Sequence, residues 1–303
     1  MLQFEAKIAL GDVRGRIDHM AIDTKRLRLF VAELGNDTVS IVDLAKRSVI
    51  KRIAGLREPQ GVGYDPSSDT LFVANARDGS LKFFQGESYE ATGGLDLGSD
   101  ADNIRIDPST KHVIVGYGDG GLAVLDNATR KKIENIALKA HPESFQIDPD
   151  GGRIFVNLPD THAVAVIDSA SGKQVTSWPM DKGGNFAMAI DRDHRRLLVA
   201  FRSPAELAIF SMADGKRIAS IETCGDVDDL FTDPSRGRVY VSCGAGFIDV
   251  IEVTGATYHR SGRISTAPGA RTSFFAPELD RLFVAARVTS TEPAAIWIFR
   301  PLP

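Results

Sequence analysis

The sequence lacks the features that mark several large classes of protein. It holds only two cysteines, Cys224 and Cys243, which are too few for a small disulfide scaffold. No apolar run approaches the roughly 20 residues that cross a bilayer, so we expect no membrane span. Acidic residues barely outnumber basic ones, 40 to 36, and no basic stripe with interleaved aromatics occurs, so we expect no nucleic-acid partner.

Familiar catalytic motifs are also missing. The chain has no Gly-x-Ser-x-Gly, His-Glu-x-x-His or Cys-x-x-Cys, and the segment Gly118–Gly121 opens no helix as a dinucleotide loop would. Met1 leads directly into Leu2-Gln3-Phe4 without a basic or apolar leader. Either the protein is cytoplasmic, or the sequence is a mature domain whose export signal is left off.

What the chain does contain is a sevenfold internal repeat. Each copy starts at an anchor residue, and a valine follows eight residues later in every copy. The steps between successive anchors are 42, 42, 41, 43, 42 and 43 residues. The anchors are Asp23, Asp65, Asp107, Asp148, Asp191, Asp233 and Ala276, and the valines are Val31, Val73, Val115, Val156, Val199, Val241 and Val284.

Each copy predicts four short β-strands, which we name a, b, c and d. After each valine comes a stretch that alternates on a period of two, such as Val39/Ile41 or Leu81/Phe83, and four anchors begin an Asp-Pro turn. In the second copy the strands are expected at Gly61–Tyr64, Thr70–Asn75, Ser80–Phe84 and Glu90–Leu97. A four-stranded unit of about 42 residues is the size of one β-propeller blade.

The seventh copy lacks its fourth strand, because only Pro301-Leu302-Pro303 follow its third. The N-terminal segment Phe4–Leu10 can supply that strand, which would close the ring and remove two exposed sheet edges. We therefore predict that residues 1–303 form a single all-β domain, a seven-bladed β-propeller of four-stranded antiparallel blades. We expect a monomer.

The repeated pattern Asp-Pro-x-x-x-x-Leu-Phe-Val-Ala resembles the YVTN-repeat propeller family, including its YncE-like bacterial members. The resemblance covers nearly the whole chain, and segments such as RIDHM (16–20) and HPESFQ (141–146) look like those of one bacterial subgroup. The family's members are often exported, so the resemblance implies a periplasmic or secreted protein, with the cytoplasm as the alternative. It implies no single reaction, since relatives include binding proteins, surface proteins and lactonases.

A propeller opens its d–a and b–c connections onto one end of the ring, which we call the mouth. Polar residues that depart from the repeat gather at the positions that should face it. The candidate ligand-binding residues are Asp18, His19, Glu33, Gln60, Asn75, Asp102, Asn103, Tyr117, His141, Glu143, Asn185, Arg202, Asp228, Asp229, Arg271 and Arg287. The mouth is expected to be acidic, with two histidines and a patch of Arg and Asn.

Two kinds of function fit such a mouth. The favoured one is a ligand-binding or interaction scaffold that recognises a small molecule, a cation or a protein and catalyses nothing. The alternative is a metal-assisted, lactonase-like hydrolase or lyase, in which His19 or His141 moves a proton and Arg271 holds an anionic group. A divalent cation (Ca²⁺, Mg²⁺, Mn²⁺ or Zn²⁺) would then be held by Asp18, Asp102, Glu143 and Asp228.

The two cysteines should lie near the mouth. They could form a disulfide if the protein is exported, or one could be a catalytic thiol, which would need a nearby histidine that the sequence does not offer. We favour a third role, in which both are small apolar packing residues.

Overall fold

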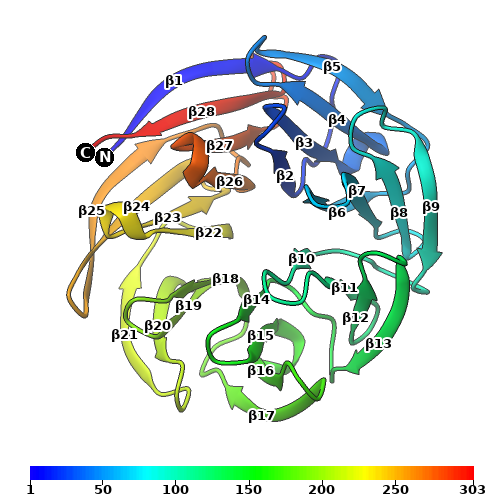
Figure 1. Cartoon of the computed structure of the whole chain (residues 1–303). Coiled ribbons are helices and arrows are strands. Elements are labelled where there is room, and N and C mark those ends of the chain that lie inside the picture. Colours follow the sequence, from blue (N-terminus) through cyan, green and yellow to red (C-terminus); the bar gives the residue numbers. More distant parts are fainter.

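Seven four-stranded antiparallel sheets form a ring in the computed structural model, which describes all residues from 1 to 303 (Figure 1). Each sheet is one propeller blade, and each blade corresponds to one repeat of the sequence. The predicted seven-bladed β-propeller is therefore confirmed. None of the four helical turns could cross a bilayer, because each is a single 3₁₀ turn.

The first four blades consist, from strand a to strand d, of the following elements: β2 (Met20–Asp23), β3 (Arg28–Glu33), β4 (Thr38–Asp43), β5 (Ser48–Ile53); β6 (Pro59–Asp65), β7 (Thr70–Asn75), β8 (Ser80–Gln85), β9 (Ala91–Asp96); β10 (Ile104–Ile106), β11 (Val113–Tyr117), β12 (Gly121–Asp126), β13 (Lys131–Ala137); β14 (Phe145–Asp148), β15 (Arg153–Leu158), β16 (Ala163–Asp168), β17 (Lys173–Pro179). The strands expected in the second blade agree with β6 to β9 to within two residues at every end.

The last three blades consist of β18 (Asn185–Asp191), β19 (Arg196–Arg202), β20 (Ala205–Ser211), β21 (Arg217–Glu222); β22 (Val227–Asp233), β23 (Arg238–Cys243), β24 (Phe247–Thr254), β25 (Thr257–Ser265); β26 (Ser273–Ala276), β27 (Arg281–Ala286), β28 (Ala295–Pro301), β1 (Leu2–Ala9). The 3₁₀ turns are η1 (Leu34–Asn36), η2 (Pro159–Thr161), η3 (Pro234–Arg236) and η4 (Pro277–Leu279).

The N-terminal strand closes the ring as predicted. β1 pairs antiparallel with β28, so that Leu2 lies opposite Pro301 and Ala9 opposite Ala295. In Figure 1 the blue N-terminal strand lies beside the red C-terminal strand, and the two chain ends are adjacent. The strand begins at Leu2 instead of the expected Phe4, because its register with β28 extends to Pro301. Closure of this kind leaves the seventh blade with a full complement of backbone hydrogen bonds.

Apolar cores fill the spaces between neighbouring blades. The repeat valine is fully buried in all seven blades, with 0% of its surface exposed. The c strands are buried on both faces, as Val39, Ser40 and Ile41 in β4 show, because every blade is packed between two others. Seven separate apolar clusters result, and the one around Ile8 and Ile296 joins the last blade to the first.

The anchor aspartates form the a–b turns at the end of the ring away from the mouth, which we call the anchor end. Asp65 accepts a hydrogen bond from the backbone N–H of Ser68 at 2.7 Å, and Asp107 accepts one from Ser109 at 2.7 Å. The predicted role of Asp in these turns is thus confirmed. Burial alone would raise the pKa of Asp65, but the bonds from Ser67, Ser68 and Asn127 lower it to about 2.

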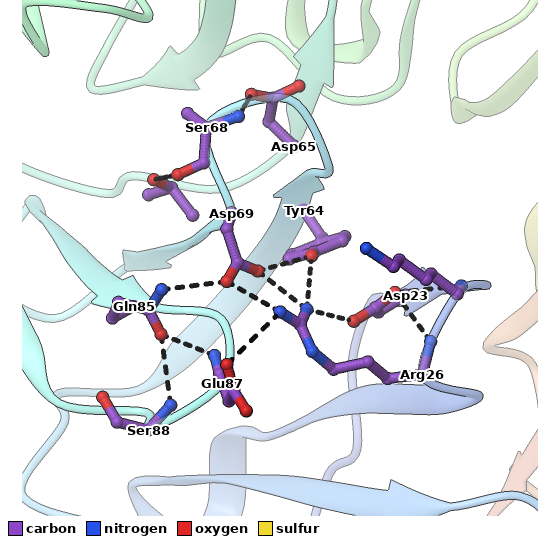
Figure 2. A network of polar contacts seen from close by, with 11 residues as sticks. Asp23, Arg26, Tyr64, Asp65, Ser68, Asp69, Gln85, Glu87 and Ser88 are labelled. Carbon is purple, nitrogen blue, oxygen red and sulfur yellow. Dashed lines mark hydrogen bonds and ion pairs between the residues drawn. The ribbon is translucent and has the colours of Figure 1, made fainter.

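The same turns also tie one blade to the next, which the repeat pattern did not predict. Figure 2 shows Arg26 of the first blade between its own anchor Asp23 and Asp69 of the second blade, with Nη1 at 2.8 Å from each. Tyr64 and Gln85 donate further bonds to Asp69, at 2.7 and 2.8 Å. Other blade pairs carry equivalent ties, namely Arg195 to Asp148, Arg236 to Asp280 and Tyr258 to Asp191.

Candidate functional site

Two cavities lie along the axis of the ring. The mouth contains a cavity of about 430 Å³, whose lining residues are mostly polar. A second cavity of about 610 Å³ is the central channel, lined by the a strands and by residues of the anchor end such as Pro234 and Pro277. His19 lines both cavities, and 19% of its side chain is exposed. The ring is therefore hollow, and His19 lies where the two spaces meet.

Backbone hydrogen bonds place one residue of each blade at the mouth, five positions before the anchor. The N–H of Asp18 donates to the carbonyl of Ala32 at 2.7 Å, and that of Asp102 donates to Gly116 at 2.9 Å. Asp102 also packs so closely on β6 that a Cβ at Gly61 would lie 1.9 Å from its carbonyl oxygen. The position of Asp102 is therefore fixed by two neighbouring blades.

β-Bulges turn the same position toward the cavity in other blades. The a–b register shifts between Asn185 and Ala187 and between Val227 and Asp229, so that Phe186 and Asp228 each lie in a bulge. A bulge inserts one extra residue and re-aims its side chain. Both residues line the mouth cavity.

One half of the mouth holds carboxylates and histidines. Nε2 of His19 lies 3.7 Å from Oδ1 of Asp102 and 3.8 Å from Oδ1 of Asp18. Asp102 is 6% exposed, and its Oδ1 has no hydrogen-bond partner, as is also the case for Oδ1 of Asn103. Burial raises the pKa of Asp102 to about 7, although the neighbouring His19 opposes this rise. Burial would lower the pKa of His19, but the carboxylates of Asp18 and Asp102 raise it.

His141 and Glu143 extend this half into the fourth blade. Nδ1 of His141 lies 2.7 Å from the carbonyl oxygen of Gly118, to which it donates, and 3.5 Å from Asp100. Burial raises the pKa of Glu143, and the nearby His141 counteracts it. Asp102, Glu143 and the two histidines thus make a group that exchanges protons near neutral pH.

The other half of the mouth holds arginines. Arg271 lies 2.8 Å from Asp226 and 3.1 Å from Asp228, and Arg202 bonds to Asp228 and stacks on the ring of Phe186 at 3.4 Å. Burial would lower the pKa of Arg271, but these two aspartates raise it. The mouth is therefore not uniformly acidic, as the sequence suggested, but is divided into a basic and an acidic half.

The structure brings together most of the residues predicted for the site. Those that line the mouth cavity are Asp18, His19, Gln60, Asp102, Asn103, His141, Glu143, Arg202, Asp228 and Arg271. Asp229 instead lines the central channel beside Arg105, where its Oδ2 accepts the N–H of Ser273 at 2.7 Å. Burial raises the pKa of Asp229 to about 6.

Four of the candidates lie outside the cavity and bond to their own scaffold. Glu33 is fully buried and accepts bonds from Thr38 and Ser40. Asn75 donates to the carbonyl of Ser80 at 3.0 Å. The remaining two are Tyr117, whose hydroxyl donates to Asn135 at 2.5 Å, and Asn185, which donates to Ala163 at 2.9 Å. Their positions at strand ends near the mouth leave them facing neighbouring strands.

Several lining residues were not among the candidates. They are Arg16, Glu58, Asp100, Ser144 and Phe186. Arg16 pairs with Asp18 at 2.7 Å, and the two lie two residues apart in an extended segment. Alternation along that segment could have indicated that both side chains share a face.

The proposed metal ligands do not form a ready-made coordination site. No three side chains among His, Cys, Asp and Glu are arranged so that they could hold a metal ion. Asp228 is paired with arginines and Asp18 with Arg16, so both carboxylates already have cationic partners. The metal assignment to Asp18, Asp102, Glu143 and Asp228 stays a prediction.

The favoured role of the cysteines is wrong. Cys224 and Cys243 form a disulfide, with 5.8 Å between their Cα atoms, instead of packing as separate thiols. The bond joins the segment after β21 to the end of β23, and both residues are buried in the core between the fifth and sixth blades. Sequence spacing could not show that the ends of two strands 19 residues apart meet at this distance.

Comparisons with known proteins support the fold alone. No family model and no curated protein matches the sequence. Among solved structures, a chain of Kuenenia stuttgartiensis hydrazine synthase superposes with a TM-score of 0.79 at 17% identity, covering 96% of this chain and 98% of that one. At this identity the likeness defines the class of protein, a seven-bladed β-propeller, and not its activity.

Proposed function

We propose that the protein is a binding propeller that holds a small polar ligand in the mouth. The observation that carries this proposal is the pair of buried, unpartnered acceptors that line the cavity, Oδ1 of Asp102 and Oδ1 of Asn103. A buried acceptor without a donor costs about 1–3 kcal/mol, which a ligand that donates to it recovers on binding. The rigid blades hold these groups in place without any need for motion.

The cavity has the size of a small-molecule site. Its volume of about 430 Å³ lies within the range of roughly 300–1,000 Å³ that is usual for such sites. Its lining is more polar than usual, since only Leu34, Ala76 and Phe186 contribute hydrophobic side chains. A small, highly polar molecule therefore fits better than an apolar one or a flat protein surface.

The proposal is tested by thermal-shift and calorimetric titration with amino acids, hydroxy acids and sugars. At least one of these probes is expected to stabilise the wild-type protein, and Asp102→Asn should weaken its binding about tenfold, which corresponds to 1.4 kcal/mol. Asp119→Asn is the matched control, because Asp119 is an exposed carboxylate on the b–c turn of the third blade, outside the cavity. If no probe binds, or if both variants bind equally well, the proposal is wrong.

A hydrolase or lyase is the second candidate, and it rests on the proximity of His19 to Asp102. The pKa of Asp102 at about 7 and the distance of 3.7 Å between the two groups suit proton transfer at neutral pH. A metal-assisted form of this reaction has no preformed ligand set to support it. Dihydrocoumarin is a suitable probe: lactone opening by the wild-type protein and its loss in His19→Gln would favour the enzyme, while equal rates would exclude it.

The disulfide bears on location. Disulfides persist in oxidising compartments, so we infer that the protein is periplasmic or secreted, as the resemblance to YVTN-repeat propellers also implies. Thiol alkylation and mass spectrometry of protein from its native source test this inference. Free Cys224 and Cys243 thiols would contradict it.

A further inference from the structure

Arg287 differs from the other arginines of the mouth. It follows β27 and is the one guanidinium there without an ion-pair partner. Four guanidiniums in this half face three carboxylates, which leaves one positive charge uncompensated. The pairs are Arg16 with Asp18, Arg202 with Asp228 and Asp226, and Arg271 with Asp226 and Asp228.

The surroundings of Arg287 are unfavourable for a cation. Its Nε is buried and has no hydrogen-bond acceptor. Burial lowers the pKa of Arg287, and the positive charges of Arg271 and Arg16 lower it further. The carboxylates of Asp18 and Asp228 act in the opposite direction but more weakly than the two guanidiniums. A half-buried cation beside two others is stabilised by an anion that enters among them.

The turn before Arg271 brings Arg287 close to it. A Cβ at Gly269 would lie 3.7 Å from Cδ of Arg287, so the Arg287 side chain passes along this turn. The N–H of Arg271 donates to the carbonyl of Gly269 at 3.0 Å, which fixes the turn itself. The backbone of one blade thus directs two guanidiniums to the same side of the mouth.

We propose that Arg287, Arg271 and Arg16 form a subsite for an oxyanion, a carboxylate or a phosphate, on the ligand of the mouth. This inference rests on the proposed binding function and narrows its ligand class. The anionic end lies against the arginines, and a hydroxyl or ammonium group at the other end donates to Asp102 and Asn103. A hydroxy acid and an amino acid both have this two-ended form.

The division of the mouth supports a ligand of this kind. Arginine presents a planar fork of donors that matches the two oxygens of a carboxylate or phosphate. Asp102 and Asn103, in the other half, present acceptors that need donors. A purely cationic ligand would leave Arg287 unpaired, and a purely anionic one would leave the two acceptors unpaired.

Inorganic phosphate and malonate are the probes, titrated into the whole protein at low ionic strength by calorimetry and thermal shift. At least one is expected to bind the wild type beyond the effect of chloride at equal ionic strength. Arg287→Gln should weaken that binding about tenfold, and Arg287→Lys should restore part of it, since lysine keeps the charge but not the fork. The preferred probe distinguishes a carboxylate from a phosphate subsite.

Arg300→Gln is the matched control, because it removes the same charge from an exposed position at the opposite end of β28. Equal weakening by both variants would show a general charge effect and overturn the subsite, as would the absence of any binding beyond chloride. Polar probes whose binding depends on Asp102 but not on Arg287 would overturn the subsite while leaving the binding function intact.

Discussion

The two ends of the ring use the same kind of residue in opposite ways. At the anchor end, Asp65 is 3% exposed, yet hydrogen bonds from its own turn and from Asn127 hold its pKa at about 2 (the turn is shown in Figure 2). At the mouth, Asp102 is 6% exposed and has a pKa of about 7. Burial is similar at the two sites. The difference lies in the donors, which surround Asp65 and are missing around Asp102.

This comparison separates structural from functional carboxylates. A carboxylate that receives several hydrogen bonds stabilises the folded state in its charged form, whereas a buried one without donors favours protonation or a ligand. The anchor end is thus built for stability, with ties such as Arg26 to Asp69. The mouth keeps part of its polar surface unsatisfied, which is typical of a binding site.

The largest effect is expected from the one covalent tie near the mouth. Replacing both Cys224 and Cys243 by alanine should lower the free energy of unfolding by about 3 kcal/mol, since a loop of this length is no longer closed in the unfolded chain. Urea unfolding of the variant and of the oxidised wild type measures this loss. Equal midpoints would show that the mouth does not depend on the disulfide.

A smaller loss is expected at the anchor end. Asp65→Asn should lower the free energy of unfolding by about 2 kcal/mol, because charge-assisted bonds from Ser67, Ser68 and Asn127 are weakened. The pKa of Asp65 is lowered, so its contribution is present above about pH 4 and is lost as the pH falls toward 2. An unchanged urea midpoint at pH 7 would contradict the structural role of this carboxylate.

The corresponding change at the mouth should have the opposite sign. At pH 8, Asp102→Asn is expected to raise the free energy of unfolding by about 1 kcal/mol, because it removes a buried charge that lacks a donor. The same urea titration serves as the measurement, with Asp119→Asn as the exposed control. Destabilisation comparable to that of Asp65→Asn would remove the distinction between the two ends.

The smallest effect is the pH dependence of that gain. The pKa of Asp102 is raised in the folded state, so the folded protein binds more protons than the unfolded chain between about pH 4 and pH 7. Stability should therefore fall as the pH rises through this window, and less steeply in Asp102→Asn. Thermal unfolding from pH 4 to pH 8 measures the slopes, and parallel curves would place the titration elsewhere.

The repeat pattern predicted most of the fold. Valines eight residues after each anchor, such as Val31 and Val241, are fully buried, and Phe4 lies in the strand that completes the last blade. Strand periodicity and turn chemistry are local properties, and a sevenfold repetition makes them reliable. The family assignment, by contrast, stays a prediction.

The site could be predicted only as a set of positions near one end. Residues five places before the anchors do line the mouth, among them Asp102 and Glu143, because the backbone repeats from blade to blade. Glu33 occupies an equally suggestive position, yet it bonds to Thr38 and Ser40 inside its own blade. Which way a side chain at a strand end points depends on its neighbours across the sheet.

The sequence by itself determined the number of blades, their strands and the closure of the ring, because these follow from short-range patterns repeated seven times. Only the tertiary structure decided the pairing of Cys224 with Cys243 and the division of the mouth into two halves. It also decided which charges remain without partners, including Asp102 and Arg287. Those properties depend on distances between residues far apart in the chain, which the folded ring fixes and a linear pattern does not contain.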